Sequence, residues 1–265
     1  MANFGKTALI TGASSGIGYE FTRLFAKGGY DLVLVARSEK QLRELAKELE
    51  EKFGVSVKII VKDLSQASAP GEVFNEVELE GITVDALVNN AGFATSGMFA
   101  EIDLEAELQE MQLNMVTLTH LTKLFLGGML QRRRGKILNV ASTAAFQPGP
   151  LMAVYYATKA YVLSFSEALA NELRGTGVTV TALCPGATAS GFQERAGIGN
   201  TRLISGRKIM DSARVARVGY RALMRGKTVV IPGFMNKLLA EMVRFAPRKV
   251  VTQAARYAQE NVNKK

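Results

Sequence analysis

Cysteine and histidine are almost absent from the sequence, with one residue of each among 265. A single cysteine, Cys184, excludes an internal disulfide, and the only histidine, His120, has no cluster of cysteine or histidine around it at metal-ligand spacing. We therefore expect a protein of a reducing compartment, without a metal site. Because no histidine is near it in the sequence to activate it, Cys184 is better interpreted as a packed strand-end residue than as a nucleophile.

Long hydrophobic runs are also missing. No uninterrupted apolar stretch reaches the ~18 residues of a membrane span, and the first six residues lead into a strand-like segment without a signal pattern. We expect a cytoplasmic protein. Hydrophobic residues make up 48% of the chain and charged residues 22%, so we expect residues 1–265 to form one globular domain with a sizeable core.

Acidic residues are scarce in the last quarter of the chain. Residues 202–265 contain 15 Lys and Arg against 3 Asp and Glu, so this segment supplies the net charge of +9. The asymmetry indicates an anionic partner for the segment: a phosphate-bearing ligand, a lipid surface or nucleic acid. Nucleic acid is the least favoured of the three, because no separate binding module accompanies the charge.

A glycine-rich loop stands between the first predicted strand and the first predicted helix. The strand covers residues 7–11, the loop is Gly-Ala-Ser-Ser-Gly-Ile-Gly at 12–18, and the helix ends near residues 28–29. Glycines allow a close approach of the backbone to a pyrophosphate, whose charge meets amide groups and the positive end of the helix. The order strand, glycine loop, helix therefore predicts a phosphate site.

The second predicted strand, residues 31–36, ends at Arg37 and Ser38. An acidic residue at this strand end would bind an adenosine ribose, whereas an arginine with a nearby hydroxyl suits a 2′-phosphate. The pair favours NADP over NAD, and the alternative is a plain surface arginine.

Further predicted strands end in polar or glycine residues and alternate with helices. The strand over residues 55–61 is followed by Asp63, which could bind an adenine amino group. The strand over 84–88 is followed by Asn-Asn-Ala-Gly at 89–92, and the strand over 135–141 by Ser142. The strand over 178–183 is followed by Cys-Pro-Gly-Ala-Thr at 184–188. A long helical region over 104–134 contains Asn114. The alternation predicts an α/β protein with a parallel sheet whose sites gather at the carboxyl edge.

Tyr155 and Lys159 are four residues apart in a helix-compatible run over 152–173, so their side chains share one face. The lysine charge is expected to lower the pKa of the Tyr155 phenol from its ordinary ~10 toward neutrality. The pair is thus predicted to be an acid–base device. Taken alone, this spacing also recurs by chance on amphipathic helices, and the glycine loop upstream is what favours the functional interpretation.

Beyond residue 188 the pattern changes. Residues 189–210 are punctuated by glycines and mix apolar with basic residues, which is typical of a mobile lid. A helix over 211–225 and a last strand over 227–232 precede two amphipathic helices within 234–265, separated at Pro247. These basic helices either cover the sheet and a substrate pocket with their basic side in solvent, or dock on a membrane or a partner.

The glycine loop, Asn-Asn-Ala-Gly, Asn114, Ser142, Tyr155 with Lys159, and Pro-Gly at 185–186 occur together in this order. With them, the chain resembles the short-chain dehydrogenase/reductase family from residue 6 to at least residue 232. The resemblance implies a Rossmann-like, doubly wound parallel sheet of about seven strands, with helices on both faces and a helical carboxyl-terminal extension. It also implies an enzyme that binds NADP(H) and moves hydride between a carbonyl and an alcohol.

The same resemblance implies the catalytic roles. Tyr155 would protonate the carbonyl oxygen, or take the alcohol proton in the reverse direction, and Lys159 would lower its pKa and hold the nicotinamide ribose. Ser142 would donate a hydrogen bond to the substrate oxygen. Asn114 would position a water that links Lys159 to solvent.

Cofactor contacts are implied in the same way. The glycine loop corresponds to the pyrophosphate contact, Asp63 and Leu64 to the adenine contact, and Asn90 to the ribose side. Thr188 would touch the carboxamide, and the 2′-phosphate would rest mainly on Arg37, because Ser15 stands where some members have a basic residue. The full predicted set is Gly12, Ser14, Ser15, Gly16, Ile17, Gly18, Arg37, Ser38, Asp63, Leu64, Asn90, Ala91, Gly92, Tyr155, Lys159, Pro185, Gly186 and Thr188.

The extension resembles, more loosely, that of hydroxysteroid dehydrogenases and 3-oxoacyl thioester reductases, which implies a lipophilic ketone, aldehyde or thioester substrate. Apolar lid residues would suit an acyl chain or fused ring, and equally plain packing of a loop: Phe192, Ile198, Leu203 and Ile204. The family also implies a homo-oligomer, dimer or tetramer, built on the long helices around Asn114 and Tyr155. The alternative to an enzyme is a non-catalytic NADP(H)-binding sensor on the same fold, which the intact acid–base residues disfavour.

Overall fold

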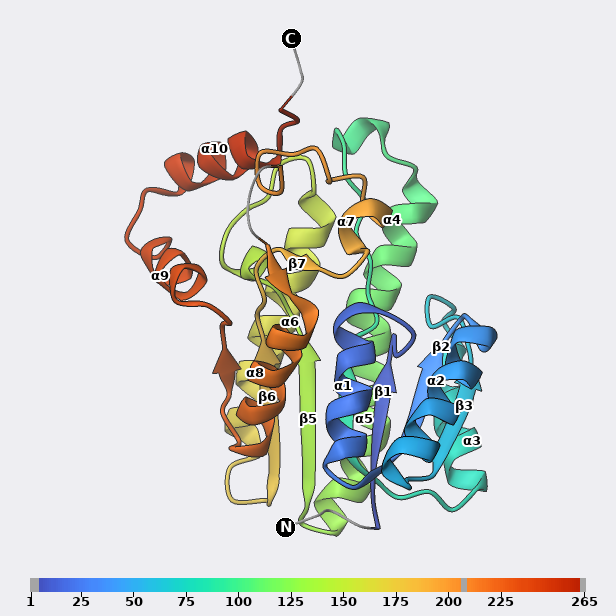
Figure 1. The fold of residues 1–265 in the computed structure, drawn as a ribbon. Coiled ribbons are helices and arrows are strands. Elements are labelled where there is room, and N and C mark those ends of the chain that lie inside the picture. Colours follow the sequence, from blue (N-terminus) through green and yellow to red (C-terminus); the bar gives the residue numbers. More distant parts are fainter. Residues whose placement is uncertain (1–4, 206–208, 263–265) are drawn as a thin grey trace.

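The computed structural model describes residues 5–205 and 209–262, and its centre is a parallel sheet of seven strands (Figure 1). The strand order is β3-β2-β1-β4-β5-β6-β9. The strands are β1 (Lys6–Thr11), β2 (Tyr30–Ala36), β3 (Val57–Val61), β4 (Val84–Asn89), β5 (Gly135–Val140), β6 (Val178–Leu183) and β9 (Val229–Val230). The winding reverses between β1 and β4, which confirms the predicted doubly wound sheet and places a ligand site at the carboxyl ends of these strands.

Helices cover both faces of the sheet. On one face, α1 (Gly16–Lys27), α2 (Glu39–Phe53) and α8 (Ser212–Met224) share a core with the strands. On the other face, α3 (Ala69–Leu79), α5 (Leu118–Gln131) and the end of α6 (Ala153–Glu172) contribute to a second core. Because both faces are buried, the middles of the central strands are continuous apolar runs, such as residues 8–10 of β1 and 86–88 of β4, rather than alternating apolar and polar residues.

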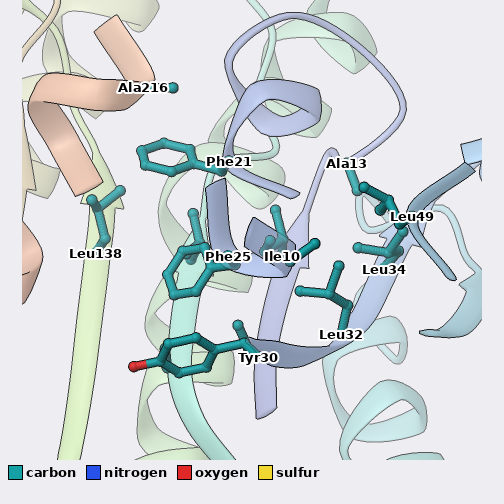
Figure 2. Close-up of a cluster of buried hydrophobic side chains, with 14 of the residues drawn as sticks. Ile10, Ala13, Phe21, Phe25, Tyr30, Leu32, Leu34, Leu49, Leu138 and Ala216 are labelled. Atoms are coloured by element: carbon teal, nitrogen blue, oxygen red, sulfur yellow. The ribbon is translucent and has the colours of Figure 1, made fainter. Parts of the chain in front are cut away.

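Phe25 of α1 shows how the first core is built (Figure 2). Its ring is fully buried and meets the Tyr30 ring edge-on, with centroids 5.1 Å apart. It meets the ring of Tyr220, from α8, in the same way at 5.0 Å. Such pairs contribute roughly 0.5–1.5 kcal/mol each beyond the burial of their area, and here one holds α1 against β2 and the other holds α1 against α8.

Two predicted elements differ from the structure by more than two residues. The helical region over 104–134 is divided into α4 (Leu104–Met111), a π-helical segment (Gln112–Thr117) and α5, because the long-range hydrogen bonds of Asn114 favour a wider turn there. The last strand is Val229–Val230 instead of 227–232, because β9 lies at the sheet edge and pairs with β6 through two residues.

The lid and the extension follow beyond the carboxyl edge. The lid region contains β7 (Thr188–Ala189), α7 (Phe192–Arg195) and β8 (Met210–Asp211), while its residues 206–208, including Gly206, lie outside the described residues. The extension consists of α9 (Phe234–Met242) and α10 (Arg248–Gln259), which stand out beyond the sheet (Figure 1), and its residues 263–265 also lie outside the described part. Pro247 is the N-cap of α10, as its predicted position between two helices requires.

Candidate active site

One cavity of about 1550 Å³ at the carboxyl edge of the sheet gathers most of the predicted site residues. Its walls include the glycine loop, Arg37 after β2, Asn90 after β4, Ser142 after β5 and Thr188 after β6. The volume exceeds the roughly 300–1,000 Å³ of ordinary ligand pockets, so the cavity has room for a dinucleotide and a second molecule. Among the predicted residues, Gly18 and Asn114 do not line it.

The glycine loop fits closely against its surroundings. Gly12 and Gly16 have φ angles of +63° and +56°, a region that favours glycine. A Cβ at Gly18 would clash with the Gly12 carbonyl oxygen, so Gly18 allows α1 to pack on the loop instead of facing the cavity. Asn90 holds the loop by donating from Nδ2 to the Thr11 and Gly12 carbonyls, at 2.9 and 3.2 Å. The amides of the first turn of α1 are thus held where they can bind a phosphate.

Arg37 and Ser38 lie on the cavity wall at the end of β2, with Asp63 and Leu64 in the same wall after β3. The Arg37 side chain is exposed, and within the described residues it makes no hydrogen bond or ion pair. An arginine with all its donors free suits a phosphate. The Asp63 carboxylate is held by the Ser65 amide and hydroxyl, which donate to it at 3.0 and 2.8 Å.

Ser142, Tyr155 and Lys159 meet on another part of the wall. Ser142 follows β5, and its Oγ accepts a hydrogen bond from the Ala144 amide at 3.1 Å. Tyr155 and Lys159 lie on α6, with Lys159 Nζ 5.7 Å from the centroid of the Tyr155 ring. Lys159 Nζ also donates to the Val140 carbonyl at 2.9 Å. A phenol, an ammonium and a hydroxyl therefore face the same space.

The electrostatics of these groups differ from the sequence-based expectation. Burial raises the pKa of Tyr155 above its ordinary value, and the largest influence against that rise is a hydrogen bond with Ser142 rather than the charge of Lys159. Burial also lowers the pKa of Lys159 to about 8, which the negative charge of Glu110 partly offsets. The expectation of a lowered phenol pKa is thus wrong for the protein alone, because the loss of solvent outweighs the lysine charge.

Asn114 is buried behind the cavity wall, in the π-helical segment. Its Nδ2 donates to the Phe93 carbonyl at 2.9 Å and to the Thr158 hydroxyl at 3.2 Å, and its Oδ1 accepts from the Phe93 amide at 3.3 Å. A Cβ at Gly92 would lie 2.8 Å from Asn114 Oδ1 and 3.6 Å from Lys159 Nζ. Asn114 therefore ties the loop after β4 to α6 close to Lys159, and it does so from a π-helical turn, a feature that is frequent at functional sites of proteins.

Sequence patterns do not reveal two further residues of the site. Glu110 on α4 is completely buried, and its Oε2 accepts hydrogen bonds from the amide and the hydroxyl of Thr95, at 2.7 and 2.8 Å. Gln259, at the end of α10, lines the cavity and donates to the Tyr156 hydroxyl at 2.7 Å. Both contacts join distant parts of the chain, and the only sequence signal is that Glu110 precedes Asn114 by one helical turn.

The cavity has an apolar part beside Tyr155. The ring of Phe192, from α7, lies 5.4 Å from the Tyr155 ring, centroid to centroid. The apolar lid residues named from the sequence all line the cavity. The extension adds Met235, Leu239, Met242, Val243, Val250 and Val251. A bulky apolar molecule can thus lie next to the phenol.

Cys184 is buried after β6, and burial raises the pKa of its thiol to about 12, which opposes formation of a thiolate nucleophile. Across 5–205 and 209–262, no three His, Cys, Asp or Glu side chains are grouped as metal ligands. In the same ranges, every helix is too short or too polar to cross a membrane.

Known proteins with similar sequences or structures include several oxidoreductases. The profile of the short chain dehydrogenase family matches residues 6–200. The very-long-chain 3-oxoacyl-CoA reductase of Anas platyrhynchos is 35% identical over 187 residues, which are 68% of this chain and 59% of that protein, so this chain spans about three fifths of that relative's length. A short-chain dehydrogenase from Sphingobium yanoikuyae in complex with NADPH is 33% identical, with a TM-score of 0.82 over 97% of this chain and 99% of that one. The bulky-bulky ketone specific alcohol dehydrogenase from Comamonas testosteroni is 31% identical, with a TM-score of 0.77 over 91% and 92%.

Proposed function

The chain belongs to the short-chain dehydrogenase family, and on that basis we propose that it is an NADP(H)-dependent oxidoreductase that interconverts a carbonyl and an alcohol on a lipophilic substrate. One observation carries the proposal. A single cavity joins the glycine loop and Arg37 to Ser142, Tyr155 and Lys159, and continues into an apolar part lined by α9 and α10. A dinucleotide and an apolar carbonyl compound bound there would meet at the acid–base residues.

The residues of the chain fit a dinucleotide with a 2′-phosphate. The helix amides behind Gly12 and Gly16 suit its pyrophosphate, and the free guanidinium of Arg37 suits the additional phosphate. The related dehydrogenase from Sphingobium yanoikuyae carries NADPH in its structure, which supports the same choice here. When bound, NADPH supplies the hydride.

Ser142 and Tyr155 are proposed to hold the substrate carbonyl oxygen. Hydroxyl groups aimed at an oxygen that gains negative charge stabilise the transition state, because they need no reorganisation during the reaction. The raised pKa of Tyr155 keeps its proton on the phenol at neutral pH until that charge develops. Lys159 places a positive charge beside the phenol, and Asn114 fixes its surroundings.

The substrate is proposed to be a ketone, an aldehyde or a 3-oxoacyl thioester with a bulky apolar part. The apolar lining beside Phe192 and along α9 and α10 supports this class. So do the names of the relatives, which specify a very-long-chain 3-oxoacyl-CoA and a bulky ketone. Reduction is the proposed direction in cells, where NADPH usually serves as a reductant.

NADPH oxidation across a panel of ketones, aldehydes and 3-oxoacyl thioesters of increasing chain length tests the function. We expect turnover that rises with apolar bulk and falls at least ~100-fold in Tyr155→Phe. Tight NADPH binding with no turnover on any substrate would instead favour the sensor. A preference for NADH would reject the role of Arg37.

A homo-oligomer, dimer or tetramer, is proposed as well. Leu104, Leu108 and Val116 expose 66%, 47% and 49% of their surface along α4 and the π-helical segment, and such an apolar patch suits a second copy. Sedimentation analysis should find an oligomer that Leu108→Arg disrupts and Leu79→Arg, at a position 88% exposed on α3, does not. A monomeric wild-type protein would contradict the proposal.

The extension is proposed to contact an anionic membrane surface. Only Ala240 of α9 is buried, Phe234 and Phe245 are 81% and 88% exposed, and the nearby Lys237 and Lys249 make no ion pair within the described residues. Apolar side chains beside unpaired cations suit anionic lipid. Cosedimentation with anionic but not zwitterionic vesicles, reduced in Phe245→Ser and kept in Leu79→Ser, is expected. If the protein binds neither anionic nor zwitterionic vesicles, the proposed membrane contact of the extension is excluded.

A further inference from the structure

Glu110 is a buried carboxylate to which the reaction proposed above gives no role. Its relative exposure is 0%, and it makes no ion pair within the described residues. Oε2 is held by the two hydrogen bonds from Thr95, whereas Oε1 is buried without a hydrogen-bond partner in the same residues. A buried, ionised carboxylate with one oxygen that accepts no hydrogen bond destabilises the folded state unless a positive charge lies nearby.

Lys159 supplies that positive charge. Asn114 follows Glu110 by one helical turn, and Asn114 Oδ1 and Lys159 Nζ lie 2.8 and 3.6 Å from the same point above Gly92, so Lys159 lies close to the residue one turn after Glu110. α4 also packs against α6, which carries the lysine. Each charge affects the pKa of the other group. Burial lowers the pKa of Lys159, and the Glu110 charge partly offsets this effect. Burial raises the pKa of Glu110, and the Lys159 charge acts against that rise.

We propose that Glu110 is a positioning residue: held by Thr95, its carboxylate keeps the Lys159 ammonium charged inside the site. The catalytic consequence rests on the proposed function, because a charged Lys159 is needed beside the Tyr155 phenol and for donation to a ribose hydroxyl. The charge pairing itself belongs to the protein without cofactor. Without Glu110, burial alone would remove the lysine proton at a lower pH.

The surrounding groups provide the matched control. Glu107, one turn earlier on α4, is also buried, and its charge raises the pKa of Glu110. Around Lys159, the Tyr155 phenol lies on the same helix, and the Cys184 thiol is a weaker influence than Glu110. Glu110→Gln keeps the shape of the side chain and an acceptor for Thr95 but removes the charge. Glu107→Gln removes an equal charge from the same helix.

The first test measures NADPH affinity against pH, by the fluorescence of NADPH, in the wild-type protein and both variants. In the wild-type protein we expect NADPH affinity to fall as the pH becomes alkaline. In Glu110→Gln this fall should begin about one pH unit lower, and in Glu107→Gln it should begin at the same pH as in the wild type. The alkaline limb of kcat/KM should shift in the same way. An equal shift in both variants, or none in Glu110→Gln, would overturn the proposal.

The second test needs no cofactor, so it separates this inference from the proposed function. Urea midpoints at pH 7 are measured for Glu110→Gln, Lys159→Met and the double variant. If the charges support each other, Glu110→Gln lowers the midpoint of the wild-type protein but not that of the Lys159→Met background. Additive midpoints would overturn the pairing even in an active enzyme. Absence of NADPH binding or turnover in the wild type would overturn the proposed function. The urea midpoints of the wild type, the two single variants and the double variant would still show whether Glu110 and Lys159 are paired.

Discussion

Gln259 Nε2 donates a hydrogen bond to the Tyr156 hydroxyl across 2.7 Å, which joins the end of the last helix to the residue beside Tyr155, the proposed acid–base residue. The same end of the chain is bonded to the lid. The Arg202 amide donates to the Glu260 carbonyl at 3.0 Å, and the Arg202 guanidinium pairs with the Glu260 carboxylate at 2.8 Å. The end of the extension is therefore hydrogen-bonded both to the lid region, at Arg202, and to α6, at Tyr156.

Loss of this hydrogen bond should loosen the substrate side of the cavity only. Gln259→Leu leaves the buried Tyr156 hydroxyl without this partner, and we expect KM for a bulky substrate to rise about tenfold, with stability lower by about 1–2 kcal/mol. NADPH affinity should stay unchanged. Gln253→Leu, at an exposed position of the same helix, is the control. Equal effects on NADPH and substrate would show that Gln259 acts on the whole fold instead.

Gly92 leaves little space for a side chain between Asn114 and Lys159. In Gly92→Ala the added Cβ would meet Asn114 Oδ1 at 2.8 Å, and Asn114 is held by hydrogen bonds on both of its side-chain atoms. We expect a stability loss of about 1–3 kcal/mol and at least a tenfold lower kcat. Gly71→Ala, in α3 with open space around it, should be neutral or stabilising. Wild-type kcat in Gly92→Ala would show that Asn114 is free to move without consequence.

Arg37 should decide between the two nicotinamide dinucleotides. Its guanidinium has no partner among the described residues, so a charged hydrogen bond to a 2′-phosphate is the interaction that Arg37→Ala removes. We expect NADPH affinity to fall about 10- to 100-fold while NADH affinity is unchanged. Arg43→Ala, which removes an exposed arginine paired with Glu39 at 2.6 Å, is the control. Parallel losses for both dinucleotides would place Arg37 outside the phosphate site.

Lys159 should destabilise the cofactor-free fold at neutral pH. Its pKa is about 8 in the folded protein and 10.5 ordinarily. The unfolded chain therefore holds more protons between these values, and stability rises with pH across that window. Below pH 8 the charged lysine costs about 3 kcal/mol, so Lys159→Met, which also loses the hydrogen bond to Val140 worth about 1 kcal/mol, should gain about 2 kcal/mol at pH 7.

Urea unfolding at pH 7 and at pH 10 measures this gain. The advantage of Lys159→Met should shrink at pH 10, where the wild-type lysine is neutral in the fold. Lys123→Met, at an exposed position of α5, should show no such pH dependence. A variant less stable than wild type at pH 7 would mean that Lys159 is well solvated or fully paired.

Much of the fold was predictable because its signals are local. A strand, a glycine loop and a helix in succession predict the β1–α1 turn, and polar strand ends predict which residues meet at the carboxyl edge. Arg37 and Thr188 line the same cavity because parallel strands end at the same edge of the sheet. These inferences need only the order of elements.

What was not predictable depends on contacts between distant segments. Asn114 bonds to Thr158, 44 residues away, and that contact accompanies a π-helical turn that no spacing reveals. Gln259 meets Tyr156 across 103 residues. The direction of the Tyr155 pKa shift is likewise not predictable from the sequence, because a four-residue spacing shows the lysine but not the loss of solvent around the phenol.

Hydride transfer from NADPH to a carbonyl carbon can be measured with NADPH deuterated at the transferable position, on each face in turn. With a long-chain ketone or 3-oxoacyl thioester, we predict deuterium on the carbinol carbon of the product from one of the two faces, by mass spectrometry. The rate should collapse in Tyr155→Phe and persist in Tyr161→Phe, a part-exposed tyrosine of the same helix. Product without deuterium from either face would exclude hydride transfer from NADPH, and labelled product formed at full rate by Tyr155→Phe would exclude Tyr155 as the acid.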